Sequence, residues 1–133
     1  MKINIKLGQK VQIEKSFSEE EVLLYIKMSC DTNPMHHDIR YAKTTMFKER
    51  IVPGLQIASL FGGLLGSKLP GNGTIHLGQT LSFKNPIYIN EKVIAVIEVI
   101  KIRNDKPIIT FKTNCYNSKN EMAIDGEAVV KII

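Results

Sequence analysis

The segment IVPGLQIASLFGGLLGSK, residues 51–68, decides how the rest of the chain must fold. Pro53 suits the first turn of a helix, where the N–H group that proline lacks would have no partner. From Leu55 to Leu65 apolar residues lie on nearly every side, mixed with alanine, serine and glycine. This pattern predicts a buried central helix that other backbone approaches closely.

Downstream of this helix, apolar residues recur at every second position, which is the pattern of a strand. Strands are predicted at residues 75–83, 92–102, 108–116 and 122–132. In the first of them Ile75, Leu77, Leu81 and Phe83 share one face. The turns RNDKP and NSKNE join the last three strands as short antiparallel hairpins.

Upstream of the helix, residues 10–17 alternate as a short strand, and Ser18 with Glu21 has the spacing of a capping box. The helix that starts there should end near Cys30, before an Asn-Pro pair. A second helical piece is predicted from Asp38, as N-cap, to about Phe47. The whole chain, residues 1–133, is thus expected to form one α+β domain with a hot-dog-like arrangement, a curved antiparallel sheet around a long helix.

The composition narrows the class of protein. The net charge is +5, but the lysines are scattered and no basic run is interleaved with aromatic residues, which disfavours a nucleic-acid partner. Residues 51–65, the longest apolar stretch, are too short and too interrupted to span a membrane. No signal peptide is visible, and Cys30 and Cys115 are interpreted as reduced core residues. These features predict a cytoplasmic protein.

The chemistry is concentrated in SCDTNPMHHDIRYA, residues 29–42. Its Asn-Pro turn can bring Asp31 and His36 toward a common point, where a carboxylate and an imidazole form an acid–base pair over one water. Asn33 is a candidate substrate contact or support for the pair; its simpler role would be to hold the turn through local backbone bonds. The alternatives are that Asp31 and His36 are ordinary turn and loop residues, or that they bind a metal with their neighbours; neighbouring histidines usually point apart, which disfavours the metal.

Two long segments, YIKMSCDTNPMHHDIRYA and TTMFKERIVPG through INEKV, resemble the (R)-specific enoyl-CoA hydratases of the MaoC-like dehydratase family, which are hot-dog proteins. By motif position, the resemblance makes Asp31 and His36 the catalytic pair. It makes the backbone N–H of Gly54 the group that binds the thioester carbonyl oxygen. Cys30 departs from the glycine common in the family, without removing the pair.

The resemblance implies reversible addition of water to a trans-2-enoyl-CoA of short to medium chain, such as crotonyl-CoA, to give an (R)-3-hydroxyacyl-CoA. It also implies a homodimer, with no metal and no organic cofactor. Either residue of the pair could be the base; we favour His36 as the base for water and Asp31 as the carrier of the C2 proton. The alternative functions are a hot-dog acyl-CoA thioesterase and a non-catalytic acyl-CoA-binding module.

Other residues are weaker candidates for the site. Ser59 is either a substrate contact or support for one, or simply a small polar residue within a helix. Gln79 falls on the apolar side of its strand and is a candidate support for the site. Leu55, Phe61 and Leu65 are candidate walls of an acyl pocket.

Overall fold

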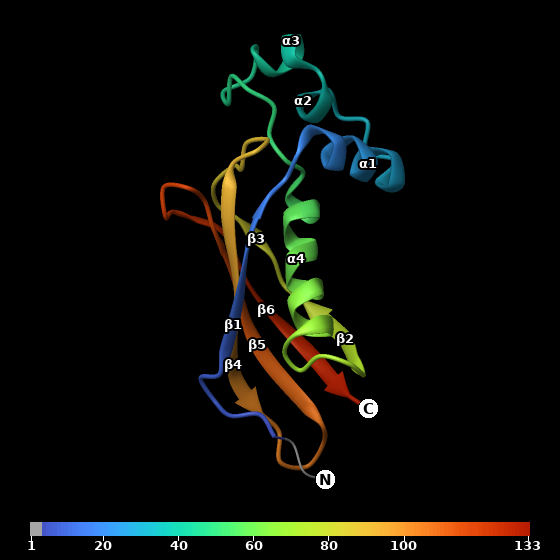
Figure 1. Cartoon of the computed structure of the whole chain (residues 1–133), viewed down its shortest axis with the longest axis vertical. Helices are drawn as coiled ribbons and strands as arrows, with labels where there is room; N and C mark the ends of the chain where they lie inside the picture. Colours follow the sequence, from blue (N-terminus) through green and yellow to red (C-terminus); the bar gives the residue numbers. More distant parts are fainter. Residues whose placement is uncertain (1–3) are drawn as a thin grey trace.

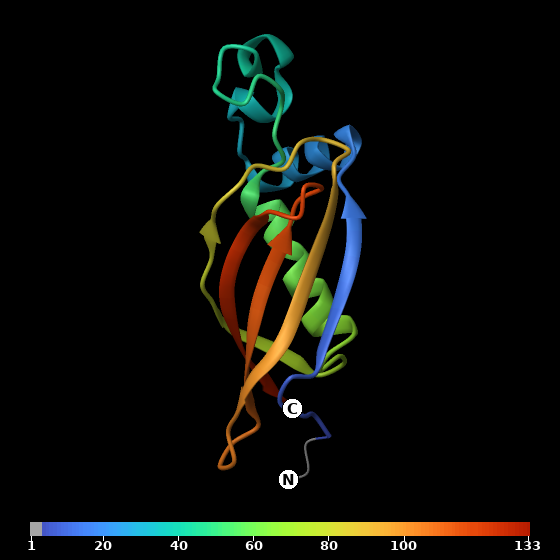
Figure 2. The ribbon, with the colours of Figure 1, turned by 90° about the vertical axis from the view of Figure 1, so that its left-hand side faces the viewer.

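The computed structural model describes residues 4–133, in which one antiparallel sheet curves around one long helix (Figure 1). The strand order is β1-β4-β5-β6-β2, and β3 also pairs with β6. The strands are β1 (Lys10–Ser16), β2 (Thr74–Gln79), β3 (Ser82–Phe83), β4 (Lys92–Ile102), β5 (Ile108–Tyr116) and β6 (Met122–Ile132). Figure 2 shows the strands bending past the helix, which is the α+β hot-dog fold predicted from the sequence.

The long helix is α4 (Gly54–Ser67), with Pro53 as the residue just before its first turn. Its inward side carries Ile57, Phe61, Leu64 and Leu65, all buried. They pack with alternate residues of β4, β5 and β6 in a single cluster of buried side chains. Burial of this apolar surface is what holds the helix in the bend of the sheet.

The prediction that α4 is enclosed on all sides is wrong for this chain alone. Leu55, Ser59, Gly62, Gly63 and Gly66 are exposed. A Cβ atom built at any of the last three would meet nothing within 4 Å. The small residues therefore open one face of the helix, and no backbone of the described residues approaches it there.

The predicted strand at residues 75–83 is broken into β2 and β3 at Thr80 and Leu81. The break lies opposite Gly126 of β6, where a Cβ would come 2.0 Å from the Thr80 carbonyl oxygen. The apolar face expected here is not buried, since Ile75 is 41% and Leu77 is 52% exposed. β2 ends the strand order, so its outer edge has no partner strand within residues 4–133.

Three shorter helices lie beyond the N-terminal end of α4 (Figure 1). They are α1 (Glu19–Ser29), α2 (Pro34–His37) and α3 (Ile39–Ala42). The capping box of α1 is present, because Glu21 N–H donates to Ser18 Oγ and Ser18 N–H donates to a Glu21 carboxylate oxygen. Asp38 caps α3 as predicted, but the helix ends at Ala42 and turns replace the expected continuation to Phe47.

Two further observations concern the whole of the described chain. No helix within residues 4–133 is long and apolar enough to cross a membrane. Both cysteines are free, but only Cys115 is a core residue; Cys30 is exposed, contrary to the prediction.

Candidate active site

Asp31 is held at the end of α1 by the turn that follows the helix. Cys30 leaves the helix in the left-handed region, with a φ of 63°. The Asn33 N–H then donates a 3.1 Å hydrogen bond to Asp31 Oδ1. One carboxylate oxygen is thereby fixed to the turn, and the other is left to face the site.

His36 is presented by α2, a single helical turn. Asn33 caps it, because Asn33 Oδ1 accepts the Met35 N–H at 3.2 Å, and Pro34 fits its first position. His36 is buried, and its Nδ1 lies 2.8 Å from the Ile51 carbonyl oxygen. A carbonyl can only accept, so Nδ1 carries the proton and Nε2 of the neutral ring has a lone pair.

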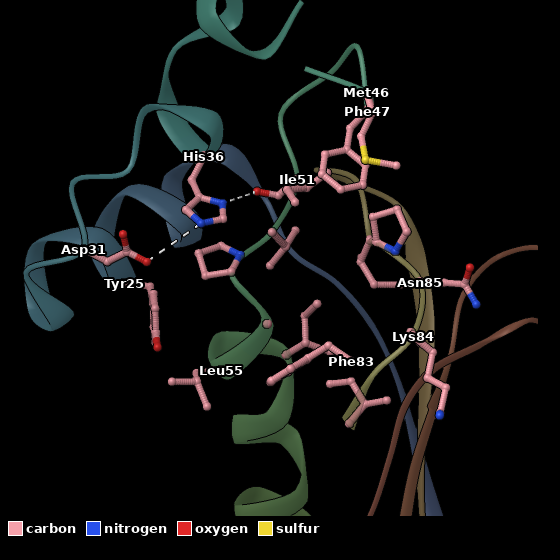
Figure 3. A pocket seen from close by; sticks show the side chains of 18 residues that line it. Tyr25, Asp31, His36, Met46, Phe47, Ile51, Leu55, Phe83, Lys84 and Asn85 are labelled. Atoms are coloured by element: carbon pink, nitrogen blue, oxygen red, sulfur yellow. Dashed lines mark hydrogen bonds and ion pairs between the residues drawn. The ribbon is translucent and has the colours of Figure 1, made fainter. Parts of the chain in front are cut away.

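That lone pair faces the carboxylate. His36 Nε2 lies 3.8 Å from Asp31 Oδ2, and the two side chains point toward one another in Figure 3. The separation is too long for a direct hydrogen bond, so a small polar molecule can bond to both groups at once. The imidazole is 9% exposed and the carboxylate 40%, which leaves the pair open on the carboxylate side.

Gly54 begins α4 close to this pair. Within residues 4–133, its backbone N–H donates no hydrogen bond, as is normal for the first position of a helix. A Cβ at this position would lie 2.6 Å from Phe83 Cε1, so the ring of Phe83 can approach only a glycine this closely. The free N–H and the positive end of the helix dipole suit an oxygen that gains negative charge.

Asp31, His36 and Gly54 line the same cavity, of about 640 Å³. Most of the wall is apolar, with Met46, Phe47, Leu55, Ile57, Phe83, Pro86 and Ile87 among its residues (Figure 3). An apolar cavity with a few convergent polar groups is the usual form of a small-molecule site. The arrangement can hold an apolar chain, polarise one carbonyl and transfer protons beside it.

Of the other predicted site residues, only some lie at the cavity. Leu55 lines the cavity, whereas Phe61 and Leu65 are completely buried in the core and do not line it. Ser59 lies on the exposed face of α4, where its hydroxyl donates to the Gln56 carbonyl. Gln79 lies on β2 away from the cavity, and its Nε2 donates to Thr113 Oγ1 at 2.8 Å.

The two polar neighbours of His36 face other partners. His37 Nε2 lies 3.1 Å from the Thr32 carbonyl oxygen, and Asp38 Oδ1 accepts the N–H groups of Arg40 and Tyr41. Among the described residues, no three His, Cys, Asp or Glu side chains meet in a metal-ligand arrangement.

Sequence reasoning missed several groups in the cavity. Tyr25 comes from α1 and Phe83 from β3, while Ile51 contributes the carbonyl that fixes the histidine tautomer. A backbone carbonyl has no sequence signature. Tyr25 could have been found, because it lies one turn before the end of the helix that leads to Asp31.

A hot-dog sheet with an Asp–His pair and a helix N-terminus on one cavity defines a class of acid–base hot-dog proteins. The MaoC like domain family matches residues 3–120, and the chain belongs to this family. It is 46% identical to an (R)-specific enoyl-CoA hydratase of Aeromonas caviae over 97% of this chain and 96% of the relative. It is 39% identical to an (R)-specific enoyl-CoA hydratase of Rhodospirillum rubrum, over 97% and 89%. The solved (R)-hydratase of A. caviae superimposes with a TM-score of 0.96 over 98% of both chains, at 45% identity.

Proposed function

We propose that this protein is an (R)-specific enoyl-CoA hydratase, a hydro-lyase that adds water reversibly to trans-2-enoyl-CoA thioesters of short to medium chain. The observation that carries the proposal is the 3.8 Å approach of His36 Nε2 and Asp31 Oδ2 on a cavity that also exposes the Gly54 N–H. Both relatives described above are themselves named as hydratases of this kind.

In the proposed reaction, the thioester carbonyl oxygen accepts the Gly54 N–H, and one water lies between His36 and Asp31. His36 Nε2 removes a proton from the water, and the hydroxyl oxygen forms a bond to C3. The C2–C3 double bond opens, and its electrons reach the carbonyl oxygen as an enolate, which the helix N-terminus stabilises. His36 passes this proton to Asp31, and Asp31 gives it to C2, so that both residues end the cycle as they began it.

The hydrogen bonds that hold His36 and Asp31 in place suit them to these two roles. The Ile51 carbonyl keeps the proton of neutral His36 on Nδ1, so that Nε2 is the basic atom on the cavity side. The turn at Asn33 holds Oδ1 of Asp31 and leaves Oδ2, which faces His36, for exchange of protons. Both protons move on the same side of the substrate, which is consistent with a single stereochemical product.

One assay tests the proposal directly. Purified protein is incubated with crotonyl-CoA, while the enoyl absorbance and free thiol are both followed. Hydration predicts loss of the absorbance without thiol release, and an (R)-3-hydroxybutyryl-CoA product on chiral analysis. Thiol release would indicate a thioesterase instead, and binding without turnover of short or medium chains would indicate a non-catalytic module.

The proposed enzyme is a homodimer. The exposed face of α4, which includes Leu55 and Gly62, and the apolar side chains of Ile75 and Leu77 on β2 give one chain an uncovered apolar surface beside an unpaired strand edge. A second copy could cover both. Light scattering should give twice the mass of one chain, and Leu77→Lys should give the monomer.

The remaining expectations concern location and cofactors. We propose a cytoplasmic enzyme of a single domain that needs no metal and no organic cofactor, because the acid, the base and the carbonyl-binding group are all supplied by the chain. Activity that survives exhaustive dialysis against a chelator would support this, and activity restored only by an added metal would contradict it.

A further inference from the structure

Gln56 is a buried polar side chain that no step of the proposed reaction uses. It is 6% exposed and lies two residues after Gly54, in the first turn of α4. Its Nε2 donates a 3.0 Å hydrogen bond to the backbone carbonyl of Glu21 in α1. Within residues 4–133, its Oε1 is buried and has no hydrogen-bond partner. A core position filled for packing alone would favour an apolar residue, so this amide needs another explanation.

The Glu21 carbonyl is the point at which this bond fastens α1 to α4. In a helix, that carbonyl also accepts the N–H of the residue four positions later, which is Tyr25. Tyr25 lines the cavity, and α1 ends two residues before Asp31. Gln56 therefore ties the helix that leads to Asp31 to the helix that begins at Gly54.

Among the described residues, one other polar contact joins α1 to the segment just before α4. The ion pair of Arg50 and Glu19, 2.8 Å long, joins α1 to the segment before α4. The Glu19 carboxylate is 58% exposed, and an exposed ion pair is screened by water and salt. The bond from Gln56 is slightly longer, at 3.0 Å, but the Gln56 side chain is buried, so water and salt weaken this bond less than the ion pair.

We propose that Gln56 is a positioning residue for the hydration reaction, which sets the place of Asp31 relative to His36 and the Gly54 N–H. The inference rests on the proposed function. The transition state needs groups from both helices at once, whereas the substrate in its ground state is held mainly by the cavity walls. Loss of the bond should therefore lower kcat and leave KM nearly unchanged.

A purely structural role makes a different prediction. Methionine has the length of glutamine and no buried oxygen to leave unpaired, so Gln56→Met should be nearly neutral for stability. If Gln56 only fills space, the variant should also keep the wild-type kcat. If Gln56 positions α1, the variant should remain folded but turn over more slowly.

The experiment compares Gln56→Met with wild type and with Thr74→Val. Thr74 is a matched control, because its hydroxyl donates a part-buried bond to the Gly71 carbonyl beyond the far end of α4. For crotonyl-CoA hydration, Gln56→Met should lower kcat about two- to tenfold, the range expected for one neutral hydrogen bond, with KM changed by less than about twofold. Thr74→Val should keep the wild-type kcat and KM.

A wild-type kcat in Gln56→Met, or a fall in KM and kcat that Thr74→Val reproduces, would overturn the inference. Thermal unfolding checks that each variant is folded, and Gln56→Leu replaces Gln56→Met in the same comparison if the latter does not fold. Absence of hydration by the wild-type protein would contradict the proposed function itself. Wild-type hydration with an unchanged Gln56→Met would contradict only the role of Gln56.

Discussion

Replacing Gly54 by alanine tests the carbonyl-binding group by a steric route. The Gly54 backbone has a φ that any residue adopts, so alanine keeps the N–H group in place unless the new Cβ is pushed away. That Cβ would lie 2.6, 2.8 and 3.2 Å from Cε1, Cδ1 and Cζ of Phe83. Because carbon atoms pack at about 3.5–4.0 Å, the ring and the first turn of α4 must separate by roughly 1 Å.

The cost in rate follows from this displacement. Loss of one hydrogen-bond donor to a developing oxyanion lowers kcat by about 10²–10³-fold, and a misplacement of about 1 Å costs about 10²-fold. Because the ring of Phe83 is 53% exposed and can take up part of this movement, we expect Gly54→Ala to lower kcat for crotonyl-CoA hydration by up to about a hundredfold. Circular dichroism and thermal unfolding should show that the variant is folded.

Phe83 supplies the control. Phe83→Ala removes the clashing ring, so the double variant should recover most of the rate that Gly54→Ala loses, after correction for Phe83→Ala alone in a double-mutant cycle. A near-normal kcat in Gly54→Ala would refute the predicted displacement of the Gly54 N–H. A loss that Phe83→Ala does not relieve would refute the steric reasoning.

Further predictions concern reactivity and stability. A thiol reagent should modify Cys30 and leave Cys115 intact in the native protein, since Cys30 is exposed and burial raises the pKa of Cys115 to about 12. Mass spectrometry of the native protein should therefore show one adduct. Two adducts before unfolding would contradict this prediction. The Lys15 ammonium, and then the N-cap backbone, lower the pKa of Glu21 below its ordinary 4.5. The stabilisation that the ionised Glu21 carboxylate gives the folded protein is then complete above pH 4.5, and it is lost as the pH falls through the lowered pKa. Glu21→Gln should therefore reduce the free energy of unfolding in urea at neutral pH and reduce it much less in acid. Equal losses at the two pH values would contradict this prediction. Phe61→Ala should lower the free energy of unfolding by about 3–5 kcal/mol, because the side chain is completely buried, and a loss below about 1 kcal/mol would contradict its place in the core.

Local signals in the sequence were sufficient for most of the fold. β4, β5 and β6 have the predicted bounds, because β-branched runs end at strong turn signals on both sides. The capping box at Ser18 likewise depends only on residues three apart. These elements are specified by near neighbours in the chain, and sequence patterns describe near neighbours well.

The elements predicted wrongly depend on other interactions. The helix after Asp38 stops early, where the hydroxyls of Thr44 and Thr45 bond back to the carbonyls of Tyr41 and Ala42 and compete with helical bonding. β2 and β3 are separated where the Thr80 carbonyl closely approaches Gly126, a contact between distant parts of the chain. An apolar pattern on α4 also cannot reveal whether its partner is the same chain or another.

The candidate site also has one part that the sequence predicted and another part that it could not predict. The spacing of Asp31 and His36 around an Asn-Pro turn predicted that they face one another, and their side chains do. The Ile51 carbonyl that fixes the histidine could not be predicted, since any residue has a carbonyl and only the fold brings this one within 2.8 Å. The contact of Gln56 could not be predicted for a similar reason, because its partner is a backbone atom of another helix.

The central claim is that Asp31 and His36 act together on one water molecule. It is tested by the kcat of Asp31→Asn and His36→Gln with crotonyl-CoA, beside His37→Gln, whose imidazole bonds the Thr32 carbonyl outside the pair. The account predicts that each of the first two variants loses about 10²–10⁴-fold in kcat while remaining folded, and that His37→Gln keeps the wild-type rate. Near-normal turnover in folded Asp31→Asn or His36→Gln would contradict it.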